Sequence, residues 1–490
     1  MSNVDPASPG TFPSLRISAA GLQPRGSFAE AQALYLHPDR GLVERLDRQL
    51  REKAVGVVAH FYMDPELQGV LGRCGWEHIQ VSDSLAMADA AIRMVEQGAE
   101  TIVVLGVDFM SENVRAMLDA AGHSKVPVYR AVADPIGCSL AESAEASSYG
   151  AYLSRAAAFS RALHVVYINT SLRTKAKAHH RVPTITCTSS NVVKTVLQAA
   201  SQIPDLRVFF GPDTYMGENL RELFEALSKM PAEAVAAVHP AHDPESVASL
   251  LPRFHYFEEG TCIVHHMFGA EVVARLERDY PDALITAHLE VPGEMFRLGL
   301  EASHRGRGVI GSTSNILDFI REKVQAAIDA CGRSRLQFVL GTESGMITPI
   351  VRDLSAMMQA HPELDLEAEI VFPVASEAIT PAPGSALGVV PGVQSGEGCS
   401  IAGGCATCPY MKMNSLDALL ELLERIGRDA PATLRPLEPH TYEERIGGRT
   451  IASLGSEPIL HMREFQKLGR LGDALLRDIE ERSQSRPTLP

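Results

Sequence analysis

Three cysteines hold equivalent places in this chain, because each follows a set of three short apolar runs. The three are Cys138, Cys262 and Cys408. Every run is rich in β-branched residues and ends in polar residues, where a strand would give way to a helix. Self-similarity on this scale indicates three related α/β units. One cysteine per unit predicts a shared metal centre with three protein thiolates.

Three thiolates suit an iron–sulfur cluster better than a hard ion such as Mg²⁺. A [4Fe-4S] cluster normally takes four cysteines. With three protein ligands, one iron stays open and can act as a Lewis acid. Structural zinc is a poorer interpretation, because the ligands lack the paired CxxC…CxxC form of zinc ribbons.

The remaining cysteines give weaker signals. Cys399 and Cys405 precede Cys408 in a C-x5-C-x2-C pattern, and CxxC alone is ambiguous between metal ligation, a redox pair and chance. Cys187 lies inside an apparent strand, so we expect it in the core. Cys74 and Cys331 have no context that predicts a role.

Polar pairs end the first apolar run of each set. Their two-residue spacing places both members on one face of a strand. The pairs are His60 with Tyr62, Tyr167 with Asn169, and His288 with Glu290. Open α/β sheets bind ligands at the carboxyl ends of their strands. For a single pair, a satisfied polar residue at a strand end is an equally good interpretation, but recurrence in all three sets favours a binding site.

The second run of each set also ends in polar residues. These are Asp83-Ser84, Thr188-Ser189-Ser190-Asn191 and Ser312-Thr313-Ser314-Asn315. Such residues are good N-caps for a following helix, and that role alone would explain them. The same geometry leaves N–H groups and hydroxyls that bind carboxylate or phosphate. No Walker A loop or Rossmann glycine pattern accompanies them, so a nucleotide is not the first choice.

The composition is that of a globular protein of 490 residues, long enough for two to four domains. Its 45 basic and 60 acidic residues give a net charge of −15 without a long basic stripe, so we expect no nucleic-acid partner. We expect no membrane association, because no run could span a bilayer and the start does not read as a signal peptide. Eight cysteines without a disulfide framework fit a reducing cytosol, so we expect a cytoplasmic protein.

Alternation of strand and helix predicts an α/β protein with parallel sheets. We expect a loose segment at 1–27, three α/β domains, a Pro/Gly-rich inserted loop at about 347–398, and a C-terminal tail with helices. The domain boundaries predicted for these parts are 28–146, 147–267, 268–425 and, for the tail, 426–490.

Longer motifs surround these residues and are spread from about 55 to 415. They include AHFYMDPELQ (59–68), SDSLAMA (82–88), GCSLAE (137–142), YINTS (167–171), TCTSSNVVK (186–194), GTCIVHHMF (260–268), AHLE (287–290), GSTSNIL (311–317), FVLGTESGM (338–346) and CPYMKMN (408–414). In these motifs and in their order, the chain resembles the quinolinate synthase family of NAD biosynthesis.

The resemblance implies three α/β/α sandwich domains about a pseudo-threefold axis with a [4Fe-4S] cluster at the centre. It implies condensation of iminoaspartate with dihydroxyacetone phosphate to give quinolinate, phosphate and water. By the same analogy Cys138, Cys262 and Cys408 hold the cluster and its open iron engages the substrate. Iminoaspartate would come from L-aspartate oxidase or aspartate dehydrogenase.

The resemblance also implies roles for residues at the strand ends. Tyr62 and Glu290 match positions of proton transfer, with His60 as a further catalytic candidate. His265 matches a histidine near the phosphate-bearing substrate. The positions implied to bind substrate are His60, Ser84, Tyr167, Ile168, Asn169, Ser189, His265, His288, Leu289, Glu290 and Thr313.

Two departures from the family pattern are visible. The family usually has H-P-E where this chain has His288-Leu289-Glu290, and we expect no loss because the middle residue would point away from the site. Cys399 lies further from Cys405 than in members with C-x2-C-x2-C, which weakens a redox role for the two. The competing class of function is a non-catalytic iron–sulfur sensor or electron carrier, which would need no His/Tyr/Glu constellation.

Overall fold

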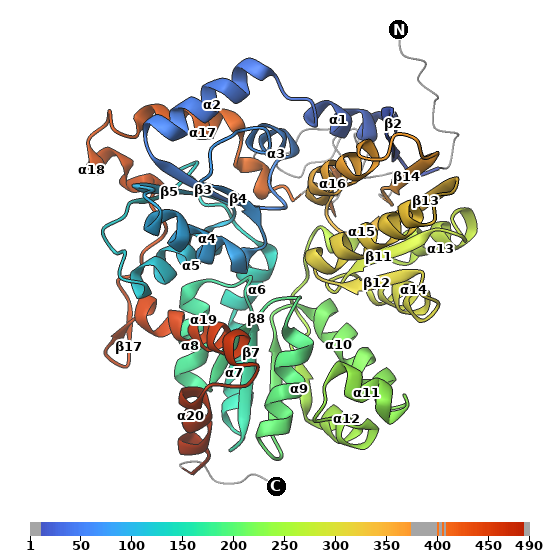
Figure 1. Ribbon diagram of the computed structural model, residues 1–490. Coiled ribbons are helices and arrows are strands. Elements are labelled where there is room, and N and C mark those ends of the chain that lie inside the picture. The colour runs from blue at the N-terminus through green and yellow to red at the C-terminus, as the bar shows by residue number, and fades with distance from the viewer. Residues whose placement is uncertain (1–10, 374–398, 401–403, 406–407, 485–490) are drawn as a thin grey trace. The chain divides into compact units, whose positions relative to one another are not determined.

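The computed structural model describes residues 11–373, 399–400, 404–405 and 408–484 (Figure 1). The chain divides into two compact units. The first unit comprises Met1–Val107, Lys125–Ile136 and Ile263–Glu438, and the second comprises Asp108–Ser124, Gly137–Cys262 and Pro439–Pro490. Among the described residues, no helix is long and apolar enough to cross a membrane.

Two larger sheets lie in the first unit and one in the second. The first unit contains a parallel sheet with the order β4-β3-β5-β6, made of β3 (Val55–His60), β4 (Ile79–Ser82), β5 (Thr101–Leu105) and β6 (Val128–Arg130). Its other large sheet has the order β12-β11-β13-β14-β1-β2, made of β11 (Leu284–His288), β12 (Gly308–Gly311), β13 (Ser334–Gly341), β14 (Leu366–Val371), β1 (Ser14–Ser18) and β2 (Gly21–Arg25). The parallel sheet of the second unit has the order β10-β9-β7-β8, made of β7 (Ala162–Tyr167), β8 (Thr184–Cys187), β9 (Arg207–Gly211) and β10 (Phe254–Tyr256).

The three sheets repeat one strand order. When β1 and β2 are left aside, the first strand along the chain in each sheet pairs with the second on one side and with the third on the other, and a fourth strand follows the third. The repeated cores are β4-β3-β5-β6, β8-β7-β9-β10 and β12-β11-β13-β14. This order places β3, β7 and β11 in the interior of their sheets. The common topology supports the three related α/β units predicted from the sequence.

The third sheet differs from the prediction in being mixed. β1 and β2 form a hairpin, and β1 pairs antiparallel with β14. We expected residues 1–27 to be loose, but Leu15 and Ile17 of β1 are fully buried. Burial of these two side chains explains why residues 14–25 form a hairpin despite their Pro, Gly and Ser content.

The predicted loop at 347–398 is partly regular. Residues Ile347–Gln359 form α16 and Leu366–Val371 form β14, which completes the third sheet. The apolar side chains of α16 recur at helical spacing and are buried, as Ile350, Leu354 and Met358 show. Residues 374–398 of the predicted loop lie outside the described part of the chain.

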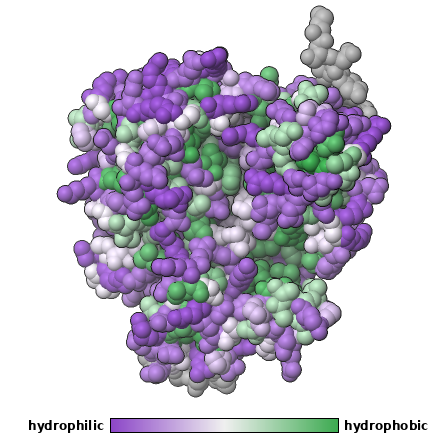
Figure 2. Space-filling model, viewed as in Figure 1, coloured by the Kyte–Doolittle hydropathy of each residue, from purple (hydrophilic) through white to green (hydrophobic). Residues whose placement is uncertain are grey.

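Helices connect and cover the strands of each unit (Figure 1). The first unit contains α1 (Ser27–Tyr35), α2 (Arg40–Glu52), α3 (Pro65–Leu71), α4 (Ser84–Glu96), α13 (Ala270–Asp279), α14 (Gly293–His304), α15 (Thr313–Asp329), α16, α17 (Leu416–Arg425) and α18 (Pro431–Leu434). The second contains α5 (Asp108–Ala120), α6 (Ser139–Glu145), α7 (Ser147–Ala157), α8 (Leu172–Arg181), α9 (Val192–Gln202), α10 (Thr214–Leu227), α11 (Ala232–Val238), α12 (Pro244–Leu250), α19 (Ile451–Leu468) and α20 (Asp473–Gln484). The face in Figure 2 is mostly polar. In the described ranges, the large apolar side chains left exposed are Leu34, Val238, Leu460 and Leu468.

Candidate functional site

One interior strand of each sheet ends at the first member of a predicted polar pair. These strand-end residues are His60 in β3, Tyr167 in β7 and His288 in β11. The pairs were predicted to lie on one face of a strand, but Tyr62, Asn169 and Glu290 lie beyond the strand ends. The intervening residue explains this, because its N–H makes one further bond to the neighbouring strand and the chain then turns. These bonds are Phe61 N to Ser82 O at 3.1 Å, Ile168 N to Cys187 O at 2.9 Å, and Leu289 N to Gly311 O at 3.0 Å.

A buried carboxylate lies between two imidazoles in the first unit. Glu290 Oε2 is 3.2 Å from His265 Nδ1, and Glu290 Oε1 is 3.4 Å from His288 Nδ1. The two rings are stacked, with centroids 4.9 Å apart and an interplanar angle of 9°. Neither nitrogen of the buried His265 ring makes a hydrogen bond of good geometry within the described ranges. An unsatisfied buried imidazole is costly, so this ring is suited to a polar ligand.

Tyr62 and His60 extend this group of side chains around Glu290. Their rings are 4.7 Å apart in an edge-to-face arrangement, and the Tyr62 ring is 6.2 Å from that of His265. The Tyr62 hydroxyl is 3.3 Å from Oγ1 of Thr342. The Nδ1 atom of His60 accepts the backbone N–H of Tyr62 at 3.1 Å, which places the proton of a neutral ring on Nε2.

Burial keeps both strand-end histidines neutral. It lowers the pKa of His60 to about 3 and that of His288 to about 4, and outweighs the opposing attraction of Glu290. Neutral imidazoles donate or accept single hydrogen bonds and bring no charge of their own. They can therefore orient a polar substrate beside the Glu290 carboxylate.

The backbone of Cys408 is hydrogen-bonded to the fully buried side chain of Glu343. Glu343 Oε1 accepts the N–H of Cys408 at 2.8 Å, and Oε2 accepts the N–H of Gly345 at 2.9 Å. Burial raises the pKa of Glu343 to about 8. A Cβ on Gly345 would lie 2.2 Å from the carbonyl oxygen of Phe61, so only glycine fits against the turn that carries Tyr62. No role was predicted for Glu343, although it stands in the TESGM motif directly after β13.

Ser84 and Thr313 are the buried first residues of α4 and α15. The residues before them act as N-caps, as predicted, whereas in the second set Asn191 before α9 makes no side-chain capping bond. Asp83 accepts the N–H groups of Leu85 and Ala86, and Ser312 forms a capping box with Asn315. A ligand role for Ser84 and Thr313 remains a prediction.

The segments that carry Cys138 and Cys262 lie side by side in the second unit. The hydroxyl of Ser139 donates to the carbonyl oxygen of Thr261 at 2.9 Å, which joins the two cysteine neighbours. The second segment is anchored further by Gly260, whose N–H donates to Thr214 Oγ1 at 2.9 Å. Both cysteines are partly exposed. Two candidate ligands are thus close neighbours in the fold although they are far apart in sequence.

The other thiols have different surroundings. Cys187 is fully buried in β8, as predicted, and burial raises its pKa well above the ordinary value. Burial also raises the pKa of Cys74 to about 12. Thiols held in the protonated form are poor metal ligands. Cys74 and Cys187 are therefore poor candidates for metal ligands, although exposure alone does not separate Cys74 from Cys138, Cys262 and Cys408, because all four are partly exposed.

The second unit also presents the Tyr167–Asn169 turn and Ser189. Tyr167 and Ile168 are buried, whereas Asn169 and Ser189 are partly exposed. Neither the Asn169 amide nor the Ser189 hydroxyl has a hydrogen bond within the described ranges. Both groups are available to a ligand.

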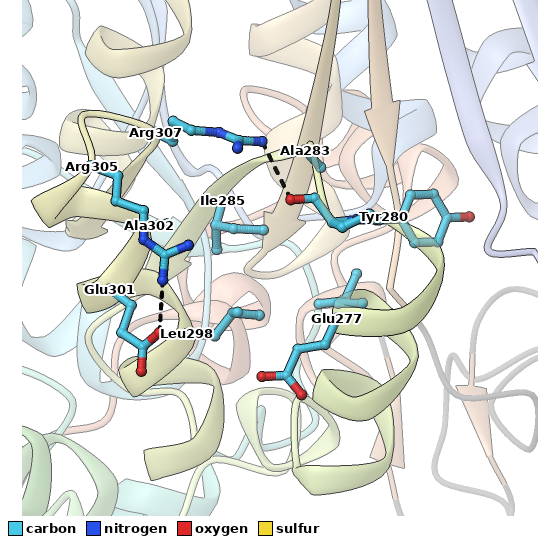
Figure 3. A pocket seen from close by; sticks show the side chains of 11 residues that line it. Glu277, Tyr280, Ala283, Ile285, Leu298, Glu301, Ala302, Arg305 and Arg307 are labelled. Carbon is cyan, nitrogen blue, oxygen red and sulfur yellow. Dashed lines mark hydrogen bonds and ion pairs between the residues drawn. The ribbon is translucent and has the colours of Figure 1, made fainter.

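A separate cavity of about 260 Å³ lies between α13 and α14 (Figure 3). Its cationic residues are already engaged, because Arg305 pairs with Glu301 and Arg307 donates to the Pro281 carbonyl. It includes Ile285 near the start of β11, whereas His288 ends that strand. None of the candidate residues lines this cavity.

Comparison with known proteins gives consistent matches. Residues 44–433 match the family model described as NadA, quinolinate synthetase A protein. The chain is 54% identical over 487 residues to a chloroplastic quinolinate synthase of Nicotiana tabacum, covering 97% of this chain and 67% of the relative. It is 54% identical over 480 residues to the chloroplastic enzyme of Arabidopsis thaliana, covering 96% and 67%. A quinolinate synthase of Cyanothece is 26% identical over 387 residues, covering 79% and 87%. The chain thus spans about two thirds of the length of these plant relatives.

Proposed function

Because the chain belongs to the quinolinate synthase family of NAD-biosynthetic enzymes, we propose that Cys138, Cys262 and Cys408 hold one [4Fe-4S] cluster. The proposal is supported by the partial exposure of these three cysteines and by the desolvation that raises the thiol pKa of Cys74 and Cys187. When bound, a cluster with three protein ligands supplies an open iron that acts as a Lewis acid toward substrate oxygens.

The reaction we propose is condensation of iminoaspartate with dihydroxyacetone phosphate to quinolinate, phosphate and water. The observation that carries it is the Glu290 carboxylate between two buried imidazoles. Ring formation requires protons to leave carbon and to reach departing oxygens, and a carboxylate is a suitable base for the first task. Tyr62 provides a phenol beside His265, and this phenol can donate a proton to a departing oxygen.

Binding roles follow from the chemistry of the remaining groups. Asn169, Ser189 and Thr313 offer uncharged donors suited to carboxylates, together with the Tyr167 hydroxyl. His60 offers its Nε2–H, and His265 offers a buried ring that fits a phosphate-bearing substrate. The remaining positions proposed to line the substrate site are Ser84, Ile168, His288 and Leu289.

Quinolinate formation by anaerobically reconstituted protein tests the proposal. We expect quinolinate when both substrates are supplied, and none when either is omitted. A sensor or electron carrier would hold the cluster without forming quinolinate. Cluster assembly in a protein that forms no quinolinate under these conditions would favour that competing class.

We propose three further properties of the protein. They comprise a pseudo-threefold arrangement of the three domains and supply of iminoaspartate by L-aspartate oxidase or aspartate dehydrogenase. The cytoplasmic location is also a proposal. The plant relatives are named as chloroplastic, so a plastid is the alternative location, and fractionation of the source cells distinguishes the two.

A further inference from the structure

The C-terminal segment, residues 439–490, lies beyond the part that matches the family model, which ends at 433. The alignments with the plant relatives leave out only 3–4% of the chain, which is less than this segment. The segment belongs to the second unit. It contains the short strands β17 (Arg445–Ile446) and β18 (Arg449–Thr450) and helices α19 and α20, of which α19 lies against α8 and β8 (Figure 1).

One side chain of the segment contacts a buried carboxylate. The Tyr442 hydroxyl donates to Glu112 Oε1 at 2.8 Å, and Glu112 Oε2 accepts the N–H of Leu172 at 2.9 Å. Leu172 is the first residue of α8, three positions after Asn169. Glu112 therefore holds the end of the Asn169 turn, and Tyr442 holds Glu112.

A buried lysine fixes the carbonyl groups of the same turn. Lys175 is fully buried, and its Nζ donates to Ile168 O at 3.1 Å and also to Thr170 O. Burial lowers the pKa of Lys175 to about 7 and raises that of Glu112 to about 7, and each group favours the charged form of the other. The turn from 168 to 172 is thus held by the Lys175 amino group at its carbonyls and by the Glu112 side chain at its last N–H.

Helix α19 approaches the same point with its backbone. A Cβ on Gly455 would lie 2.3 Å from the carbonyl oxygen of Leu172, so this contact requires glycine. Tyr442 and Gly455 therefore reach Leu172 by two independent routes. Asn169 lies between Tyr167 and the residues that Tyr442 and Gly455 hold. Its side chain is partly exposed, and its amide has no hydrogen bond in the described ranges.

We propose that the C-terminal segment positions the substrate site, with Tyr442 and Gly455 holding the 168–172 turn so that the Asn169 amide is fixed toward its ligand. The inference rests on the proposed function of Asn169 in binding a carboxylate. Tyr442 is then a positioning residue, because it acts through Glu112 and Leu172 and not on the substrate.

Tyr442→Phe in the reconstituted holoenzyme is the first test. It removes one hydroxyl, so we expect the cluster absorption and kcat to be retained while KM and the Kd for quinolinate rise about three- to tenfold. Tyr256→Phe is the matched control, since the Tyr256 hydroxyl has no hydrogen bond in the described ranges and should give wild-type values. Gly455→Ala should reproduce the Tyr442→Phe phenotype.

A double mutant distinguishes the inference from the proposed function. If Tyr442 acts through Asn169, Tyr442→Phe combined with Asn169→Ala should bind quinolinate no more weakly than Asn169→Ala alone. Multiplied losses would overturn the inference. Wild-type kinetics of Asn169→Ala would overturn the proposed role of Asn169. An impaired Asn169→Ala beside an unimpaired Tyr442→Phe would overturn the positioning role alone.

Hydrogen exchange gives a readout independent of turnover. We expect the backbone amides of residues 168–172 to exchange faster in Tyr442→Phe than in the wild type and in Tyr256→Phe, with exchange in β9 unchanged. Unchanged exchange in the 168–172 turn would contradict the inference.

Discussion

Glu343 accepts a hydrogen bond from the backbone N–H of Cys408 at 2.8 Å, although the two residues are 65 positions apart in the chain. The carboxylate is fully buried and its second oxygen accepts the N–H of Gly345. Two N–H donors therefore converge on one side chain. This arrangement fixes the backbone of a proposed cluster ligand to the end of strand β13.

Glu343→Gln should weaken cluster retention. A glutamine has one acceptor oxygen, so its NH₂ group would oppose the N–H of either Cys408 or Gly345. An unsatisfied buried group costs roughly 1–3 kcal/mol. We expect a lower iron-to-protein ratio and faster loss of visible cluster absorption in air. Glu363→Gln, at an exposed position, should behave as the wild type, and equal cluster stability in both variants would contradict the role of Glu343.

Replacement of any proposed ligand, Cys138, Cys262 or Cys408, by alanine should abolish the cluster and quinolinate formation. Cys331→Ala is the matched control, because Cys331 is exposed and no ligand role is proposed for it. Iron and sulfide analysis of anaerobically purified proteins measures the outcome. A variant without Cys262 that retained a full cluster would sink the assignment of that ligand.

Local patterns in the sequence predicted the parts of the fold that depend on local chemistry. The polar ends of β3, β7 and β11 and the caps at Asp83 and Ser312 follow from strand periodicity and N-cap preference. The recurrence of these signals also indicated the three related sheets, which the common strand order supports.

The features that the sequence did not predict depend on contacts between residues that are far apart in the chain. The five residues of β1 form a strand because β14 offers a partner more than 340 residues later, as the Ser14–Glu369 hydrogen bond shows with its separation of 355. The contacts of Glu343 with Cys408 and of Tyr442 with Glu112 also join distant segments. No local periodicity encodes such contacts, so neither carboxylate was predicted.

The free energy of unfolding should decrease as the pH is lowered, and His164 is one cause. This ring is fully buried in β7 and bonded to the Tyr149 hydroxyl at 2.8 Å, and burial lowers its pKa to about 3. An unfolded histidine has a pKa of about 6.5, so below that pH the unfolded chain binds the extra proton and unfolding is favoured. The contribution of His164 to the free energy of unfolding is fully present above pH 6.5, and about 2 kcal/mol of that free energy is lost at pH 5.

Urea midpoints at neutral and acidic pH measure this effect. Other buried histidines contribute to the same trend, so the informative quantity is the difference between the wild type and His164→Gln. The variant should be less stable at neutral pH but should lose less stability on acidification. His304→Gln, on the exposed surface of α14, should keep the wild-type slope. An unchanged slope in His164→Gln would show that the folded protein accommodates a charged His164.

Glu290→Gln tests proton transfer at the centre of the candidate site. The substitution keeps the shape of the side chain and an acceptor oxygen between His265 and His288, but removes the base. Since this carboxylate is buried beside the His265 and His288 rings, no solvent-exposed group readily replaces it. We expect the variant to retain its cluster and bind quinolinate, while kcat falls by about 10²–10⁴-fold.

A control variant and an alternative role for Glu290 can both be tested. Glu294→Gln, four residues later on the exposed face of α14, should have wild-type turnover. If Glu290 only pairs with a neighbouring cation, Glu290→Gln should lower thermal stability without a comparable loss of kcat. Turnover of Glu290→Gln near the wild-type rate would make Glu290 a positioning residue. The base would then be sought first at His60, whose Nδ1 accepts the Tyr62 N–H and whose Nε2 faces no partner in the described ranges.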